Sequence, residues 1–359
     1  PDIEKFITAK KDYTQLTNFN LSIAITDDFI KAYKTNNTYE LKHNNVVYKK
    51  IGARDILKRI AQSIYQSGEP GFIFIDEINR HNPTIHIGKI TATNQCGEQP
   101  LLPYEACNLG SVVLNKFLLV ENLSQNIPNE QKIDWVKLAE IVKLGIRFLD
   151  NTITVSKHLL PQIEQIVKYG KRKVGLGVMG WADLLYELNI PYDSKEALDL
   201  AEKIMSFIND NAREESEKLG KEKGSFGNFK GSIWEKQGHK YMRNATVTTI
   251  APNGTTSLLA DCNGGIEPFF ALGYSRKNME TIENTELFYI NEILEKKLKK
   301  EWLYEKELME VIVKSGSIQN IDKIPSRIKR VFVGSLDIEP KWHLMMQSAF
   351  QKYTDNAVS

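Results

Sequence analysis

The chain has 359 residues, of which 42% are hydrophobic and 26% charged, as in a soluble globular protein of one large domain or two ordinary ones. Its net charge of +2 argues against strong attraction to nucleic acid or membrane, and no apolar run is long enough to span a bilayer. No secretory signal begins the sequence, and three cysteines without a framework spacing suit a reducing cytoplasm. Because residue 1 is Pro rather than Met, we expect a piece of a longer protein.

The first elements are short and ordinary. Residues 1–33 begin with a helical pattern and continue into residues 16–25, where apolar and polar residues alternate as in a half-buried strand. Thr26 or Asp27 is placed to cap the helix that follows. Residues 35–50 are polar and rich in Asn and Lys, which predicts a surface loop or hairpin without chemistry.

Residues 71–76 form an apolar run that predicts a strand buried on both faces. Asn79 and His81 follow it, and strand ends are where α/β folds build their sites. These two side chains either line a site or satisfy the backbone of their own loop, and the second interpretation is favoured. His81, His86 and Cys96 have a poor spacing for zinc, so we expect no structural metal.

Residues 93–111 contain two of the three cysteines. If this segment is extended, Asn94, Cys96 and Glu98 share one face, with the thiol between an amide and a base. The stretch also contains three residues that disfavour a helix and favour a stiff loop, namely Gly97, Pro100 and Pro103. A thiol on such a loop can serve as a nucleophile, a metal ligand, a redox group or a hydrogen-atom donor.

Two long amphipathic helices are predicted further along. Apolar residues recur at helical spacing over residues 133–158 and again over 195–223. Between them, residues 175–180 formally match the dinucleotide fingerprint, but a lone match is weak evidence. We interpret these glycines as a place where backbones pack closely.

Residues 244–250 are β-branched and alternating, which predicts a strand that leads into the small-residue loop 251–257. Backbone N–H groups and hydroxyls converge where this loop enters a helix, and such a helix start favours an anion. It is not a Walker loop, because the Gly-Lys pair is absent. The candidate anion-binding residues are Pro252, Asn253, Gly254, Thr255 and Thr256.

The remainder of the chain predicts packing elements. Cys262 is interpreted as a small apolar side chain. Residues 283–314 are charged and helix-forming, which predicts a solvated outer face. Residues 337–354 predict a helix whose apolar side comprises Trp342, Met345, Met346 and Phe350.

The thiol segment, residues 93–111, closely resembles the active-site loop of ribonucleotide reductases. Its amino-acid sequence is most similar to that of the class II, adenosylcobalamin-dependent enzymes. The family pattern Asn-x-Cys-x-Glu, followed by a redox-active cysteine, falls on Asn94, Cys96, Glu98 and Cys107. Gln95 stands where class II members usually have proline, which removes a constraint on the loop. The 251–257 loop is similar to the class II loop that grips substrate phosphates, except that Asn253 stands where Thr is common, so one hydroxyl contact is replaced or lost.

The resemblance implies an α/β fold, as a partial ten-stranded α/β barrel of the ribonucleotide reductase and glycyl-radical type. A central finger loop would carry the radical cysteine. Residues 1–359 would form one catalytic barrel domain, incomplete at both ends. The enzyme would be cytoplasmic.

The resemblance also implies the chemistry, which is reduction of ribonucleotides, chiefly diphosphates, for DNA synthesis. A thiyl radical on Cys96 would abstract the 3′-hydrogen, Glu98 would take the 3′-hydroxyl proton, and Asn94 would hold the ribose hydroxyls. Cys107 would be one of two reducing thiols, with its partner upstream of Pro1. Substrate contacts would come from Asn94, Gln95, Cys96, Gly97, Glu98, Pro252, Asn253, Gly254, Thr255 and Thr256.

The implied cofactor is adenosylcobalamin, and the implied partners are a thioredoxin- or glutaredoxin-type dithiol, nucleotide effectors bound by upstream segments, and a second subunit of a homodimer. No nucleic acid, membrane or metal is expected. The main alternative is the large subunit of a class I reductase, whose radical comes from a separate subunit. A second alternative is a non-catalytic barrel fragment. A third is a thiol hydrolase or acyl-transferase using Cys96, but the sequence offers no persuasive His partner for it.

Overall fold

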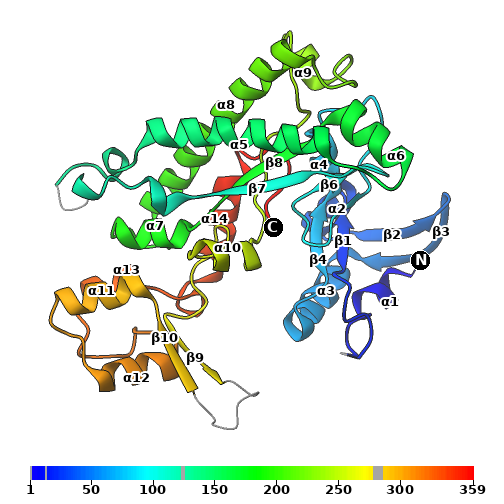
Figure 1. Ribbon diagram of the computed structural model, residues 1–359. Helices are drawn as coiled ribbons and strands as arrows, with labels where there is room; N and C mark the ends of the chain where they lie inside the picture. The colour runs from blue at the N-terminus through cyan, green and yellow to red at the C-terminus, as the bar shows by residue number, and fades with distance from the viewer. Residues whose placement is uncertain (1, 13, 123–125, 278–285) are drawn as a thin grey trace. The chain divides into compact units, whose positions relative to one another are not determined.

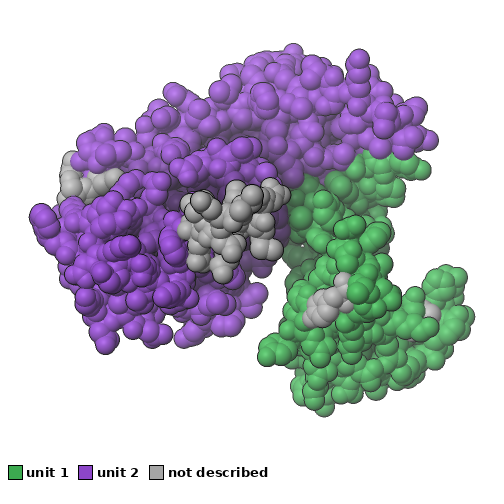
Figure 2. Space-filling view, turned by 60° about the horizontal axis from the view of Figure 1, so that its bottom comes forward, with its two compact units in different colours: residues 1–105, 230–238 green, residues 106–229, 239–359 purple. Residues whose placement is uncertain are grey.

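The computed structural model describes residues 2–12, 14–122, 126–277 and 286–359. The chain divides into two compact units, coloured separately in Figure 2. Unit 1 comprises residues 1–105 and 230–238, and unit 2 comprises residues 106–229 and 239–359. The prediction that residues 1–359 form one domain stays a prediction. Within the described ranges, no helix is both long and apolar enough to cross a membrane.

Unit 1 is built from short helices and two-stranded sheets (Figure 1). Its elements are α1 (Ile3–Ile7), β1 (Ser22–Ile25), α2 (Asp27–Lys34), β2 (Thr38–His43), β3 (Val46–Gly52), α3 (Ala53–Ser67), β4 (Gly71–Phe74), α4 (Ile75–Arg80), β5 (Ala92–Thr93), β6 (Pro100–Leu101) and α9 (Ile233–Lys236). Strands β2 and β3 pair antiparallel, which confirms the predicted hairpin. The hydroxyl of Thr26 accepts a hydrogen bond from the Phe29 N–H, which confirms the predicted cap of α2.

Strands β1 and β4 pair in parallel, from Ser22 opposite Gly71 to Ile25 opposite Phe74. The first strand is shorter than predicted, since only its last four residues join the ladder. The prediction that β4 is buried on both faces is wrong in this structure, because Phe72 and Phe74 are 41% and 53% exposed. The reason is that a two-stranded sheet leaves β4 at an edge with one neighbour.

Unit 2 is organised around two parallel strands and two long helices. Strands β7 (Asn108–Val113) and β8 (Val174–Met179) pair in register over their full lengths. Helices α5 (Trp135–Val155) and α8 (Lys195–Lys223) pack on each other, and α5 lies along both strands (Figure 1). These bounds confirm both predicted helices.

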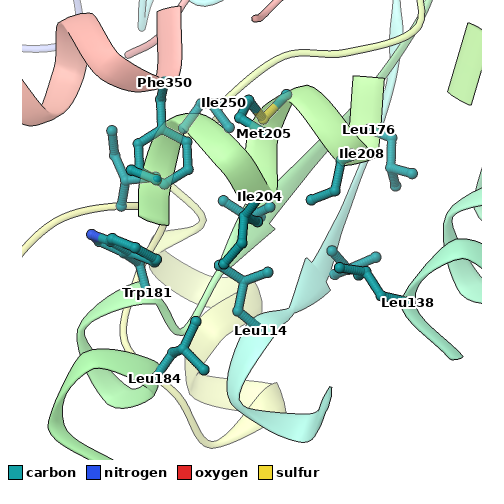
Figure 3. Packing of buried hydrophobic residues seen from close by; sticks show 14 of the residues in the cluster. Leu114, Leu138, Leu176, Trp181, Leu184, Ile204, Met205, Ile208, Ile250 and Phe350 are labelled. Atoms are coloured by element: carbon teal, nitrogen blue, oxygen red, sulfur yellow. The ribbon is translucent and has the colours of Figure 1, made fainter. Parts of the chain in front are cut away.

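The core of unit 2 is made by the apolar faces of these elements (Figure 3). Leu138 of α5 and Ile204 and Ile208 of α8 are almost wholly buried, as the helical spacing predicted. Fully burying one such side chain contributes roughly 1.5–3 kcal/mol. The rings of Trp181 and Phe350 meet edge to face with centroids 5.3 Å apart. The core therefore holds β7 and β8 rigidly.

Residues 244–250 are buried but do not form the predicted continuous strand, because the segment bends at Ala245 and has only isolated bridges. Thr248 forms a parallel bridge with Leu176, and Ile250 forms one with Val358. The Val247 N–H instead donates to the Asp355 carboxylate at 2.8 Å. A side chain thus replaces a backbone partner, which interrupts the ladder.

The glycines of residues 175–180 allow close packing of backbones, which confirms that interpretation. A Cβ on Gly177 would lie 2.3 Å from the backbone oxygen of Thr249. No side chain fits at that distance. Strand β8 and residues 244–250 can therefore lie this close together only because residue 177 is a glycine.

The rest of unit 2 surrounds this core. Its further elements are the 3₁₀ turns Leu114–Phe117, Val120–Asn122, Asn129–Lys132 and Ser335–Asp337, α6 (Pro161–Glu164), the π-helix Gln165–Lys171, α7 (Trp181–Glu187), α10 (Gly254–Ala260), β9 (Gly273–Lys277), β10 (Glu286–Ile290), α11 (Glu292–Lys300), α12 (Lys306–Ser315), α13 (Ser326–Val331) and α14 (Pro340–Gln351). The prediction of helix throughout 283–314 is wrong at β10, which pairs with β9, while 283–285 lie outside the described residues. Helix α14 buries Met346 and Phe350 as predicted, but Met345 is 45% exposed.

Candidate functional site

The predicted thiol loop lies in unit 1, between β5 and β6. These strands pair antiparallel, with Ala92 opposite Leu101 and Thr93 opposite Pro100. The Asn94 N–H donates to the Gln99 backbone oxygen at 3.1 Å, and the Gln99 N–H donates to Asn94 Oδ1 at 3.0 Å. These bonds close a six-residue loop, residues 94–99.

Within this loop the chain reverses, which confirms the predicted loop and means that the shared face of an extended segment does not apply. The Gly97 N–H donates to the Asn94 backbone oxygen at 3.2 Å, and Gly97 has a φ of 88°. A left-handed residue of this kind favours glycine. Because the segment turns, Cys96 is exposed and Asn94 is half-buried, whereas Glu98 is only 3% exposed. Strand alternation therefore does not place these side chains.

A residue that the sequence did not single out braces the turn. Asn20 Nδ2 donates to the backbone oxygen of Gln95 at 3.1 Å. Gln95 is exposed and occupies the second position of the turn 94–97, where proline is a favoured residue. The turn thus forms with glutamine at this position.

The electrostatics of Cys96 narrow the possible roles of its thiol. Burial of the sulfur raises the pKa of Cys96, and the negative charge of Glu98 raises it further. A thiol with a raised pKa keeps its hydrogen at neutral pH, which makes it a poor thiolate nucleophile or metal ligand. The S–H bond that a hydrogen-atom donor needs is retained.

Gln99 is a second residue that sequence reasoning missed. Its side chain is 3% exposed, and neither Nε2 nor Oε1 has a hydrogen-bond partner among the described residues. A buried amide in this state costs free energy relative to a hydrated one. Its position directly after Glu98 was the only available signal.

Cys107 lies in unit 2, directly before β7. It is half-buried, and its Sγ lies 3.6 Å from the backbone oxygen of Asn108. Pairing of Asn108 with Val174 fixes the start of the strand that follows. The thiol in this position directly precedes a strand that is paired with β8 along its full length.

The predicted anion loop also lies in unit 2. The predicted helix start is confirmed, but α10 begins at Gly254, inside the segment 251–257 that was predicted as a loop, and Asn253 precedes it with a φ of 57°. Pro252 is half-buried, and Gly254, Thr255 and Thr256 are exposed. Backbone N–H groups and two hydroxyls are thus presented together, which suits an anionic ligand.

The Asn253 side chain is engaged within unit 2. Its Oδ1 accepts from the Ser111 hydroxyl at 3.0 Å. Its Nδ2 donates to the backbone oxygens of Ala251 at 2.9 Å and Val178 at 3.3 Å. Any contact that Asn253 makes with a ligand would therefore come chiefly from its backbone.

The remaining candidates have structural roles. Asn79 donates to the backbone oxygens of Ile75 and Ile90 and accepts from the Ile90 N–H, which confirms that it satisfies backbone. His81 pairs with Glu77 at the surface. Cys262 is half-buried, and burial raises its pKa to about 11, with Asp183 adding to the effect. In the part of the chain that the structure describes, no three His, Cys, Asp or Glu side chains are grouped to hold a metal ion.

Comparisons with known proteins cover the whole chain. It matches the family described as "Ribonucleotide reductase, barrel domain" over residues 1–241 and 236–359. It is 43% identical to a vitamin B12-dependent ribonucleoside-diphosphate reductase of Thermoplasma acidophilum, with 100% of this chain and 45% of that protein aligned. A protein of the same description from Mycobacterium tuberculosis is 38% identical, with 100% and 50% aligned. The chain thus spans about half the length of these curated relatives.

More distant matches agree. A ribonucleoside-diphosphate reductase subunit alpha of Chlamydia pneumoniae is 31% identical over 87% of this chain and 32% of its own length. Among solved structures, a class Id ribonucleotide reductase alpha subunit of Actinobacillus ureae superposes with a TM-score of 0.76 at 22% identity, covering 99% of this chain and 62% of that one. This likeness confirms the predicted α/β reductase-barrel fold.

Proposed function

Because the chain belongs to the ribonucleotide reductase family, we propose that it is the part of a class II enzyme that reduces ribonucleoside diphosphates to 2′-deoxyribonucleotides. The observation that carries this proposal is the turn 94–97, which presents Cys96 with its hydrogen retained. Asn94 and Glu98 belong to the same closed loop. A hydrolase or acyl-transferase would need a thiolate, which this environment disfavours.

The proposed cofactor is adenosylcobalamin, as in the relatives named vitamin B12-dependent. When bound, it supplies a carbon-centred radical able to take a hydrogen atom from a thiol. The exposed, protonated thiol of Cys96 fits that chemistry, since hydrogen-atom transfer needs an intact S–H bond within reach.

The steps at the ribose are assigned to the loop. The Cys96 sulfur, having lost its hydrogen, takes the hydrogen atom from the 3′ carbon. Glu98 accepts the 3′-hydroxyl proton, and the 2′-hydroxyl leaves as water after it takes a proton from one of the two reducing thiols; Glu98 returns its proton to the 3′ oxygen at the end of the cycle. Asn94 Oδ1 accepts from the Gln99 N–H, so its Nδ2 is the group able to hold a ribose hydroxyl without competing for a proton.

Two electrons and two protons must then reach the sugar. Cys107 supplies one thiol, and a second cysteine of the full-length enzyme supplies the other, so that a disulfide forms as water leaves. The hydrogen held by Cys96 returns to the 3′ carbon. An external dithiol of the thioredoxin or glutaredoxin type reduces the disulfide.

The substrate's phosphates are assigned to residues 252–256. The exposed residues Gly254, Thr255 and Thr256, with their N–H groups in the first turn of α10 and the hydroxyls of the two threonines, support this assignment. For the complete enzyme we propose nucleotide effectors, a homodimer and a cytoplasmic location, the last because three cysteines without a disulfide framework suit a reducing compartment.

The deciding experiment uses the full-length enzyme. Loss of tritium from the 5′ carbon of labelled adenosylcobalamin into water is followed with nucleotide and dithiol present. We expect exchange that disappears in Cys96→Ser, together with loss of reduction. Substantial deoxynucleotide formation by Cys96→Ser would overturn the mechanism. Absence of exchange, with reduction restored by an iron or manganese radical subunit, would assign the enzyme to class I.

A further inference from the structure

The phosphate loop is tied to the core of unit 2 by one side chain. Asn253 joins three backbone or side-chain groups, namely the Ser111 hydroxyl of β7, the Val178 oxygen of β8 and the Ala251 oxygen of its own loop, at 3.0, 3.3 and 2.9 Å. Both strands belong to the rigid core described above. A side-chain amide uses an acceptor and both donors in this arrangement.

The backbone of Asn253 also holds the loop in place. Its φ of 57° is left-handed, a region that asparagine tolerates better than a β-branched residue does. Its backbone oxygen accepts from the Ser257 N–H at 2.8 Å, within the first turn of α10. Asn253 therefore connects the strands to the helix start.

A second segment supports the loop from another side. A Cβ on Gly264 would lie 2.9 Å from the Pro252 oxygen, and one on Gly265 would lie 3.0 Å from the Ala251 oxygen. The preceding residue, Asn263, is held by its N–H to the Asp183 carboxylate at 2.7 Å. The loop is thus confined between the strands and a fixed glycine pair.

We propose that Ser111 and Asn253 are a positioning pair that holds the phosphate-binding loop in its binding-competent form. The inference rests on the proposed function of residues 252–256, and neither side chain needs to contact the substrate. A loop held in its bound conformation loses less entropy on binding, which strengthens binding. The pair therefore acts on affinity for the phosphates and leaves the chemistry at the ribose unchanged.

The geometry also predicts that the two residues act as one unit. The Ser111 hydroxyl bonds to Asn253, so removing either partner breaks the same connection. Residues that share one hydrogen bond give non-additive effects in a double-mutant cycle. If Ser111 contributed only by packing, the loss of affinity in Ser111→Ala would be the same whether or not Asn253 was present.

The test measures equilibrium dissociation constants of the full-length enzyme for a ribonucleoside diphosphate and for the corresponding nucleoside. The variants are Ser111→Ala, Asn253→Gly, which keeps the left-handed backbone accessible, and their combination. We expect Ser111→Ala to weaken diphosphate binding about fivefold and Asn253→Gly to weaken it at least as much, because it removes all three hydrogen bonds. The double variant should be no weaker than Asn253→Gly. Nucleoside binding stays unchanged in Ser111→Ala, because Ser111 lies in β7, outside the phosphate-binding residues 252–256.

Two controls accompany these variants. Ser111→Thr keeps the hydroxyl, so this variant should bind the diphosphate as tightly as the unmodified enzyme does. Ser315→Ala removes a hydroxyl whose hydrogen bonds to described residues all lie within residues 311–317 of unit 2, and it should have no effect on diphosphate affinity. Thermal melting of each variant identifies any that fail to fold, in which case the other single variant carries the test.

Unchanged diphosphate affinity in both single variants, additive losses, or an equal loss for the nucleoside would each overturn the positioning pair. These measurements do not need turnover. Failure of the proposed reduction would appear separately, as an unmodified enzyme that binds the diphosphate but forms no deoxynucleotide.

Discussion

Asn94 and Gln99 hydrogen-bond to each other twice, and the second bond uses the side chain that is also assigned to the ribose. The Asn94 N–H meets the Gln99 oxygen at 3.1 Å, and Asn94 Oδ1 accepts from the Gln99 N–H at 3.0 Å. One amide thus shapes the loop with its oxygen and leaves its nitrogen for a ligand. The effect of Asn94 on loop stability can therefore be measured separately from its proposed contact with the ribose.

Replacing Asn94 tests this separation. Asn94→Ala leaves the Gln99 N–H without its acceptor, so we expect a loss of about 1 kcal/mol in the free energy of unfolding as well as loss of reduction. Asn94→Asp keeps the acceptor, so stability should be retained while reduction is lost. Urea denaturation and turnover assays measure both quantities. Equal stability of the two variants would show that the loop does not depend on this bond.

Replacing Gln95 by proline should stabilise the turn. Position 95 is the second residue of the turn, where proline is favoured, and the Asn20 contact uses only its backbone oxygen, which proline retains. We expect Gln95→Pro to raise the free energy of unfolding by about 0.4–1 kcal/mol, mainly by restricting the unfolded chain. Denaturant titration measures it. Destabilisation would mean that residue 95 has a backbone conformation or N–H contact that proline cannot provide.

Gln99 offers a prediction in which an apolar residue improves stability. Its buried amide has no hydrogen-bond partner among the described residues, so Gln99→Met removes a polar group that burial penalises. We expect the free energy of unfolding to rise by about 1 kcal/mol. The matched control is Gln95→Met on the exposed part of the same loop, where no gain is expected. A loss of stability in Gln99→Met alone would show that the amide is satisfied in the intact enzyme.

The raised pKa of Cys96 predicts its reactivity with iodoacetamide. Only the thiolate reacts, and Glu98 is one of two causes that disfavour it, so Glu98→Gln should lower the pKa of Cys96. At pH 8 the alkylation rate should then increase roughly two- to fivefold. Mass spectrometry of the modified Cys96 peptide gives the rate separately from Cys107 and Cys262. A slower or unchanged rate would remove Glu98 as a cause.

Long helices were the most predictable part of this fold, because their burial pattern is local. The spacing over residues 195–223 predicts the bounds of α8 as observed. Residues 244–250 were less predictable, since their ladder is interrupted by Asp355, more than a hundred residues further along the chain. Strand β10 likewise depends on pairing with β9, which a charged, helix-forming sequence does not reveal.

The thiol loop shows the same distinction. The residue types Asn94, Cys96 and Glu98 are evident from the sequence, but their arrangement is not, because the turn depends on the left-handed Gly97 and on two bonds between Asn94 and Gln99. The contact from Asn20 to Gln95 spans 75 residues and has no local signal. The alternation expected of a strand therefore does not describe how these three side chains are arranged, and their assignment to a site stays a prediction.

Strand β7 connects two groups that the proposed reaction uses at opposite ends of its substrate. Cys107 immediately precedes the strand, and Ser111 is its fourth residue. Four extended residues span on the order of 13 Å, and pairing with β8 prevents that length from changing. The strand therefore fixes the distance between Cys107, the proposed reducing thiol, and Ser111, the proposed anchor of the loop 252–256. A nucleotide whose ribose and phosphates are separated by a different distance would contact either Cys107 or the loop 252–256, but not both.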